Sequence, residues 1–164
     1  MLEGHLQTRI TPKKTPIGTI HILWHMEDRP VISKVILPGN LNRKTKFTSL
    51  PLKSVKMENL ALDLCSNFQR KVLNVIYKIP VGFVSTYACI AEKLSTSPRS
   101  IGRALATNPF PIIVPCHRIV KSDGSLGGYQ GSSWMKKRLL ESEGIKFDEN
   151  KIIDKNRIIR DVKG

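Results

Sequence analysis

Residues 86–107, TYACIAEKLSTSPRSIGRALAT, decide the fold of the C-terminal half of this chain. Their first part has the apolar spacing of a short helix over about residues 86–94, and a polar turn follows it. Ser97 then suits the N-cap of a second helix and Pro98 its first position, so we expect this helix to continue to about Thr107. Two helices joined by a tight turn in a basic protein indicate a helix-turn-helix.

The second of these helices presents two arginines away from the core. Ile101 and Leu105 lie four residues apart and form its buried face. Arg99 precedes Ile101 by two positions, which is about 200° around a helix, and therefore faces outward. Arg103 shares that outward face. Solvation is enough to explain surface arginines, but their place on a candidate recognition helix favours contact with DNA.

The segments upstream predict a separate N-terminal domain. The alternating residues Ile20, Ile22 and Trp24 predict a half-buried strand, and residues 31–37 predict a second one, so the two form an antiparallel hairpin. Residues 39–58 are basic and irregular and are interpreted as a solvated connection. A helical pattern that ends before Pro80 follows, and we place the domain boundary near residue 58. The apolar positions of that helix are Phe68, Val72, Val75, Ile76 and Ile79.

The formal net charge of +14 favours a polyanionic partner. Its excess is spread over residues 1–58 and 59–147, whereas the tail from Asp148 is nearly balanced. Such a field attracts nucleic acid and makes binding depend on salt, although a basic surface also serves solubility. No stretch approaches the roughly 18 apolar residues that span a bilayer, and no signal-peptide pattern begins the chain. We therefore expect a cytoplasmic protein with no membrane partner.

The cysteines and histidines predict neither a disulfide framework nor a metal site. Cys65, Cys89 and Cys116 are odd in number and widely spaced. His21 and His25 are four residues apart, but in strand-like sequence this spacing does not bring two side chains onto one ion.

Cys116 has neighbours that are unusual for a structural cysteine. A short apolar strand is expected over residues 112–114, Pro115 makes the approach rigid, and His117 and an arginine follow directly. The thiolate is the nucleophilic form of cysteine, and positive neighbours lower its pKa. Adjacent side chains of a strand point to opposite faces, so Cys116 and His117 need a bend or a bridging water to cooperate.

A glycine-rich segment follows the cysteine. Residues 126–131, LGGYQG, allow close approach of the backbone to a ligand, and Tyr129 offers a ring that can stack on a base. An ordinary mobile loop is the alternative interpretation.

A further helix is expected after this loop, capped by Ser133 and closed by Gly144. Glu143 lies at its C-terminal end, where the helix dipole disfavours a carboxylate. This position suggests another partner for Glu143, and His117 is a candidate. The residues expected to face inward are Trp134, Leu139 and Leu140.

The segment PCHRIV, residues 115–120, resembles the active-site signature of O6-alkylguanine-DNA alkyltransferases, also called methylated-DNA–protein-cysteine methyltransferases. The resemblance covers residues 66–145 strongly and 15–38 weakly. Because the chain lacks the N-terminal cysteine and histidine set of the zinc-containing relatives, it resembles the zinc-free members. The other segments that match in order and spacing are residues 15–18, 68–72, 79–82, 85–87, 99–102, 108–109, 128–129 and 143–144.

The resemblance implies an α+β fold. A small N-terminal antiparallel β-sheet domain, RNase H-like, would precede a mainly α-helical C-terminal domain with a winged-helix-like helix-turn-helix. Residues 1–58 would be an N-terminal α/β structural domain and residues 59–147 the DNA-binding and active-site domain. Residues 148–164 would be a C-terminal tail, whose role the sequence leaves open.

The resemblance also implies DNA repair by direct damage reversal. The methyl or alkyl group of O6-alkylguanine would pass irreversibly to the thiolate of Cys116, so each molecule acts once and needs no cofactor. His117 would deprotonate Cys116 through a water, and Glu143 would hold the imidazole. Tyr87 would assist extrusion of the base and act at guanine N3, and Asn108 would be a hinge between the recognition helix and the active-site strand. The range of alkyl groups and activity on O4-methylthymine stay open.

The implied partner is double-stranded DNA that contains O6-alkylguanine, bound in the minor groove by a monomer with the damaged nucleotide flipped out. Arg99 would fill the vacated space, and the backbone N–H of Gln130 would donate to O6, at a position where many relatives carry serine. The other residues implied are Ser97, Ser100 and Arg103 for DNA and Pro111, Tyr129 and Gly131 for the pocket.

Three rival functions are weaker. A damage sensor of the alkyltransferase-like kind replaces the cysteine that this chain keeps. A helix-turn-helix transcription factor leaves Tyr87, Arg99 and Glu143 unexplained. A Cys–His hydrolase lacks an oxyanion-hole turn here and leaves the Arg99 helix without a role.

Overall fold

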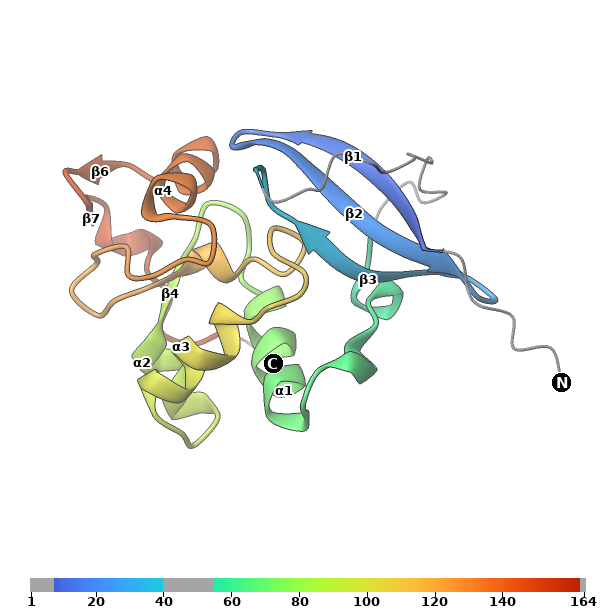
Figure 1. Cartoon of the computed structure of the whole chain (residues 1–164). Coiled ribbons are helices and arrows are strands. Elements are labelled where there is room, and N and C mark those ends of the chain that lie inside the picture. Colours follow the sequence, from blue (N-terminus) through green and yellow to red (C-terminus); the bar gives the residue numbers. More distant parts are fainter. Residues whose placement is uncertain (1–7, 40–54, 163–164) are drawn as a thin grey trace, which may run out of the picture. The chain divides into compact units, whose positions relative to one another are not determined.

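The computed structural model describes residues 8–39 and 55–162 of the chain (Figure 1). The chain divides into two compact units, Met1–Cys65 and Ser66–Gly164. The fold class is α+β, as expected: the described part of the first unit contains a three-stranded antiparallel sheet, and the α-helices of the described residues all lie in the second unit. Most of the basic connection expected over residues 39–58 lies outside the described residues.

The first unit contains a three-stranded antiparallel sheet in the order β1 (Arg9–Thr15), β2 (Gly18–Met26) and β3 (Pro30–Ile36). The hairpin of β2 and β3 and the period-two burial on β2 are confirmed, whereas β1 was not foreseen. Its sequence, RITPKKT, has too few apolar residues to show alternation. The buried residues of β2 are Ile20, Ile22 and Trp24.

The first unit extends beyond the division expected near residue 58. Two short 3-10 helices, η1 (Met57–Asn59) and η2 (Leu62–Leu64), follow the sheet. Between them the Ala61 N–H donates to the Ile32 carbonyl of β3 at 2.9 Å, so this segment is attached to the sheet. The change from strand-like to helix-like sequence therefore precedes the structural division at Cys65.

The second unit begins with three capped helices, α1 (Asn67–Tyr77), α2 (Tyr87–Lys93) and α3 (Pro98–Ala106). Each N-cap hydroxyl accepts the backbone N–H of the third residue of its helix, as serine and threonine caps commonly do. The positions of α2 and α3 agree with those expected from the sequence. Phe68 of α1 is exposed rather than buried, and Leu73 takes a core position instead. The three caps are Ser66, Thr86 and Ser97.

A two-stranded parallel sheet joins the helices to the cysteine segment. Strand β4 (Ser85–Thr86) pairs with β5 (Ile119–Val120), with Ser85 opposite Ile119. Because β4 runs directly into α2 and β5 directly follows the Cys116 turn, the sheet places the start of α2 beside the cysteine. Helix α4 (Ser133–Ser142) completes this part of the unit.

The prediction of a strand over residues 112–114 is wrong. These residues form a turn in which Ile112 has a φ of +73°. Pro111 and Pro115 bracket the turn and have no N–H to donate to a ladder, and three apolar residues cannot distinguish a strand from a turn. Cys116 and His117 are likewise not in a strand but in a 3-10 helix, η3 (Cys116–Arg118).

The inward face of α4 also differs from the expectation. Ser132, not Ser133, caps the helix, and Trp134 is 59% exposed. Lys136, Leu139 and Leu140 form the buried face, at the i, i+3, i+4 spacing of one helical side. Trp134 lies off this side, so its apolar character was misleading.

The described part of the C-terminal tail belongs to the second unit. It contains a hairpin of β6 (Phe147–Asp148) and β7 (Lys151–Ile152) and the 3-10 helix η4 (Lys155–Arg157) (Figure 1). In the described part of the chain, no helix has the length and apolar character needed to cross a membrane.

Candidate active site

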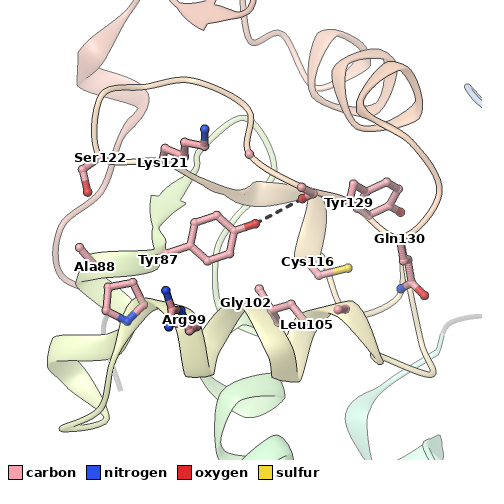
Figure 2. Close-up of a pocket in the computed structure, with 14 residues that line it drawn as sticks. Tyr87, Ala88, Arg99, Gly102, Leu105, Cys116, Lys121, Ser122, Tyr129 and Gln130 are labelled. Carbon is pink, nitrogen blue, oxygen red and sulfur yellow. Dashed lines mark hydrogen bonds between the residues drawn. The ribbon is translucent and has the colours of Figure 1, made fainter.

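A cavity of about 710 Å³ lies within the second unit (Figure 2). Cys116 lies at its wall, and the start of α2, the outer part of α3 and residues 121–130 surround it. Figure 2 shows Tyr87 and Cys116 above α3, with the Cys116 sulfur on the side of Gln130. The lining residues are Tyr87, Ala88, Pro98, Arg99, Gly102, Leu105, Ala106, Cys116, Lys121, Ser122, Gly127, Gly128, Tyr129 and Gln130.

The Cys116 thiol is nearly buried, with 4% of the residue exposed. Burial raises the pKa of this thiol, because a thiolate is poorly solvated there. A hydrogen bond from Asn108 Nδ2 to Sγ, 3.2 Å long, and the charge of Lys136 oppose this rise. The expectation that positive neighbours leave the thiol with a lowered pKa is therefore wrong: burial dominates, and Cys116 rests as a thiol that needs a base.

Asn108 connects the end of α3 to the cysteine turn. Its Nδ2 donates to the Val114 carbonyl at 3.3 Å as well as to Cys116 Sγ, and its Oδ1 accepts the Phe110 N–H at 2.9 Å. The Gln130 side chain donates to the Asn108 carbonyl at 3.1 Å. The side chain is buried and bonded through both its amide nitrogen and its oxygen, so Asn108 ties the end of α3 to the cysteine turn.

His117 is buried, does not belong to the lining of the cavity, and bonds through one ring nitrogen to the residue at the end of α4. Successive side chains of a 3-10 helix are about 120° apart, so adjacent Cys116 and His117 point in different directions. The His117 Nε2 lies 3.0 Å from Glu143 Oε1, which confirms the partner that the sequence indicated for this carboxylate. Among the described residues, no hydrogen bond reaches the buried Nδ1.

Arg118 holds the same carboxylate with two further bonds. Its Nε donates to Glu143 Oε2 at 2.9 Å and its Nη2 to Oε1 at 2.7 Å. Burial opposes the ionisation of Glu143, but the hydrogen bonds from His117 and Arg118 prevail and lower its pKa to about 2. Burial lowers the pKa of His117, and Glu143 only partly offsets this. The pair thus holds an ionised carboxylate and a neutral imidazole at neutral pH.

Tyr87 is the first residue of α2 and crosses the cavity. Its hydroxyl donates to the Gly128 carbonyl at 3.2 Å (Figure 2). Gly127 has a φ of +68°, and a Cβ there would lie 3.0 Å from the Tyr87 ring, so glycine suits this close approach. Burial raises the pKa of Tyr87, which keeps its hydroxyl protonated and able to donate.

Lys136 is a site residue that the sequence interpretation missed. It is fully buried on α4, and its Nζ donates to the Ile119 and Gly128 carbonyls and lies 5.7 Å from the centre of the Tyr87 ring. Burial lowers its pKa to about 8, so the ammonium form persists at neutral pH. The spacing of Lys136 before Leu139 and Leu140 was the available signal, because it places the lysine on the apolar side of the helix.

The residues expected to contact DNA lie on the outer side of the two-helix segment. Arg99, Arg103 and Ser97 are exposed, and Ser97 also caps α3. Arg99 lines the cavity, whereas Ser100 and Arg103 line a smaller depression of about 330 Å³ beside the start of α1.

Of the pocket residues expected from the sequence, two line the cavity and two do not. Tyr129 and Gln130 line the cavity, but Pro111 and Gly131 do not belong to its lining. The described residues contain no group of three or more His, Cys, Asp or Glu side chains arranged to hold a metal ion.

Comparison with known proteins relates the second unit to one family. A family model described as the DNA-binding domain of 6-O-methylguanine DNA methyltransferase matches residues 67–145. A methylated-DNA–protein-cysteine methyltransferase of Methanothermobacter thermautotrophicus is 50% identical over 84 residues, which are 51% of this chain and 48% of that protein. The protein of the same name from Pyrobaculum aerophilum is 55% identical over 74 residues, 45% of this chain and 50% of that protein. The chain therefore matches about half the length of these relatives.

Solved structures extend the similarity of fold to both units. OGT of Mycobacterium tuberculosis, crystallised in complex with DNA, has a TM-score of 0.64 at 25% identity over 82% of this chain and 92% of that chain. The O6-methylguanine-DNA methyltransferase of Pyrococcus kodakaraensis has a TM-score of 0.64 at 24% identity, over 85% of this chain and 100% of that chain.

Proposed function

We propose, from the premise that this chain belongs through residues 67–145 to the 6-O-methylguanine DNA methyltransferase family, that it repairs DNA by taking the alkyl group of O6-alkylguanine onto Cys116. One observation carries the proposal above all: the Cys116 sulfur faces a cavity of about 710 Å³ that Tyr87, Tyr129 and Arg99 also line. A sulfur sealed in a core, with no cavity beside it, would have excluded this chemistry.

The size and walls of the cavity suit a purine taken out of its helix. Its volume lies within the range of about 300–1,000 Å³ typical of ligand sites. O6 of guanine is out of reach of a protein nucleophile inside the base stack, so the nucleotide must be extruded. Tyr87 and Tyr129 provide two aromatic side chains for the flipped base, and the N–H of Gln130 is the proposed donor to O6.

The transfer is an in-line displacement at the alkyl carbon. The thiolate of Cys116 forms the new carbon–sulfur bond as the bond from carbon to O6 breaks, and the electron pair of that bond leaves with guanine. The thiol proton passes to His117 through a water, and Tyr87 donates its hydroxyl proton at N3 of the leaving guanine. The proton held by His117 then returns through water to Tyr87, and guanine takes its ordinary N1–H form by exchange with water. The net change is one alkyl group gained and one proton lost by Cys116, with unmodified guanine as the product. A thioether is very hard to cleave, so each molecule acts once.

The electrostatics of the site suit His117 as the base that accepts the proton of Cys116. Burial keeps Cys116 protonated at rest and His117 neutral, and a neutral imidazole is the form that accepts a proton. Glu143 stays ionised, and it stabilises the imidazolium once the proton arrives. Lys136 adds a buried positive charge that favours the thiolate.

DNA is the proposed partner, bound by α3 and its neighbours. Arg99 is exposed at the start of α3 and reaches the cavity, which suits a side chain that fills the space left by the base. Arg103 and Ser100, beside the second depression, are proposed to contact phosphates together with Ser97. We expect the protein to act as a monomer in the cytoplasm.

Intact-mass spectrometry after incubation with duplex DNA containing O6-methylguanine tests the proposal. Wild-type protein is expected to gain the mass of one methylene unit, located on the peptide that contains Cys116. Cys89→Ala, which changes another thiol of the second unit, should gain the same mass, and Cys116→Ala should bind DNA but gain none. Binding of damaged DNA by wild-type protein without any gain in mass would instead indicate a sensor.

A further inference from the structure

We propose that the C-terminal tail, residues 147–162, is a positioning element that holds Tyr87 and one wall of the cavity in place. The tail lies beyond the segment matched by the family model, and the sequence left its role open. The inference rests on the proposed alkyl transfer where its test measures activity. Its structural test, by hydrogen exchange, rests only on the contacts of the tail.

The tail pairs with the backbone that leads into Tyr87. The Val84 N–H donates to the Arg157 carbonyl at 2.9 Å, and the Ile159 N–H donates to the Val84 carbonyl at 2.8 Å. The Ser85 hydroxyl donates to the Ile159 carbonyl at 2.9 Å. Because β4 pairs with β5 through Ser85 and Thr86, the backbone of residues 84–86 has partners from both directions.

The Arg157 side chain holds the preceding loop. Its Nη1 donates to the Gly82 carbonyl at 3.3 Å, and its guanidinium lies 5.4 Å from the centre of the Phe83 ring. A Cβ at Gly82 would meet the Glu143 carbonyl at 3.2 Å and Arg157 Nη1 at 3.4 Å. The loop is therefore closely confined between the tail and the end of α4.

The β6–β7 hairpin supports a second part of the cavity wall. The Ile152 N–H donates to the Gly124 carbonyl at 3.1 Å, and Lys151 pairs with Ser125 in an antiparallel bridge. The turn that contains Gly124 begins with Lys121 and Ser122, which line the cavity. Ile152 is buried in the same apolar cluster as Val84.

Short strands explain why such support is needed. Strand β4 has two residues, and an isolated pair of short strands is marginal in water. Tyr87 follows β4 directly, so a shift of that strand displaces its hydroxyl from Gly128 and from the proposed position of guanine. Small displacements of a reacting group reduce rates strongly.

The matched variants Arg157→Ala and Arg160→Ala test the inference in the full-length chain. Both remove one positive charge from the tail, but Arg160 is exposed and only Arg157 contacts Gly82 and Phe83. The measurement is the second-order rate of alkyl transfer from free O6-benzylguanine, which enters the cavity without duplex DNA. We expect Arg157→Ala to lose about fivefold, the effect of one lost hydrogen bond and ring contact, and Arg160→Ala to match wild type.

The same two variants in a Tyr87→Phe background separate positioning from general stability. If the tail acts through the Tyr87 hydroxyl, Arg157→Ala should cost less than about twofold once that hydroxyl is gone. An equal loss in both backgrounds, or equal rates for the two arginine variants, would overturn the proposal.

Hydrogen exchange gives a readout that does not depend on alkyl transfer. Ile159→Pro removes the N–H that donates to Val84, and it should speed amide exchange in peptides covering residues 83–93 while α3 keeps its protection. Unchanged exchange over residues 83–93 would contradict the role of the tail. A wild-type protein that gains no alkyl group would refute the proposed function and leave this measurement in force.

Discussion

Lys136 is a buried lysine whose charge lies close to the nucleophile of the proposed reaction. Its pKa of about 8 keeps it positive at neutral pH, and its charge lowers the pKa of Cys116 against the effect of burial. Two backbone carbonyls, of Ile119 and Gly128, hold the ammonium in place. The charge of Lys136 therefore favours the thiolate form of Cys116.

Replacing Lys136 by Met should make Cys116 a weaker nucleophile. Without the buried charge, the pKa of the thiol rises further, and each tenfold fall in its acidity constant reduces the thiolate fraction about tenfold. The rate of Cys116 alkylation by iodoacetamide as a function of pH, followed by mass spectrometry, measures this. Lys137→Met, at the partly exposed neighbouring position, is the control. A pH profile that Lys136→Met leaves unchanged would show that the lysine only fills space.

Glu143 predicts a pH dependence of stability. Its pKa is about 2 in the folded state against an ordinary value of 4.5, so its ionised form favours folding. That contribution is present above about pH 4.5 and is lost as the pH falls toward 2. Wild-type unfolding free energy should therefore fall with acidification in this window more steeply than that of Glu143→Gln, as measured by urea denaturation at each pH. Parallel curves would contradict the strong ion pair.

The same substitution should change activity through His117. The carboxylate raises the pKa of the imidazole against the effect of burial, so Glu143→Gln leaves a less basic and less oriented histidine. Transfer from O6-benzylguanine should fall at every pH, and the acidic limb of its pH profile should move to lower pH. Acid unfolding would move the acidic limb to higher pH, so a shift to lower pH distinguishes a less basic histidine from a less stable fold.

Between elements, Gln69 connects two helices at the point where α3 ends. Its Nε2 donates to the Ala104 carbonyl at 3.0 Å, the Thr107 carbonyl at 3.1 Å and the Thr107 hydroxyl at 3.1 Å. The last carbonyls of a helix lack partners within it, so a side-chain donor there stabilises the helix end. Asn108 is the next residue after Thr107 and donates a hydrogen bond to Cys116. The Gln69 side chain therefore links α1 to the end of α3 and, through Asn108, to the nucleophile.

Gln69→Ala should therefore destabilise the protein by about 1 kcal/mol and slow transfer from duplex DNA. Asn67→Ala is the control, because Asn67 bonds to Arg70 of its own helix. Denaturant unfolding gives the stability change, and single-turnover rates with duplex DNA and with O6-benzylguanine give the functional one. A greater loss on duplex DNA is expected, since α3 carries the proposed DNA contacts. Equal stability of the two variants would contradict the role of Gln69.

The elements that the sequence predicted correctly are those encoded by neighbouring residues. The α2–α3 pair has its caps, its proline and its apolar face within about twenty residues, so local chemistry alone predicts it. The turn at residues 112–114 and the inward Lys136 depend on contacts with Asn108, Ile119 and Gly128, which no local pattern contains. Strand β1 is likewise specified by pairing with β2 rather than by its own residues.

The site was predicted in its residue types more fully than in its geometry. The family resemblance brought Tyr87, Asn108, Cys116 and Tyr129 together, and the structure places all four around or beside the cavity. The resting protonation of Cys116 could not be predicted, because the pKa depends on burial and a sequence does not state burial. The support from the tail was also hidden, since it consists mostly of backbone hydrogen bonds.

For the molecule as a whole, the net charge of +14 predicts that salt should weaken binding of duplex DNA but hardly change alkyl transfer from a free base. Binding to duplex DNA releases counterions from the phosphates, so its affinity should fall steeply as salt rises, with a slope of about 0.9 per phosphate neutralised. Transfer from O6-benzylguanine involves an uncharged substrate in a cavity within the protein, and its rate should change little over the same range. Salt titrations of duplex affinity and of the transfer rate measure the two.

Arg103→Ala tests whether the positive charge on α3 contacts a DNA phosphate. Arg103 is exposed on α3, where we propose a phosphate contact, so its loss should reduce the salt slope by about one. Arg138→Ala removes the same charge from an exposed position on α4 and should leave the slope unchanged. If both variants reduced the slope equally, the whole basic surface rather than α3 would attract the duplex, and the assignment of α3 as the DNA-binding helix would fail while the chemistry at Cys116 remained intact.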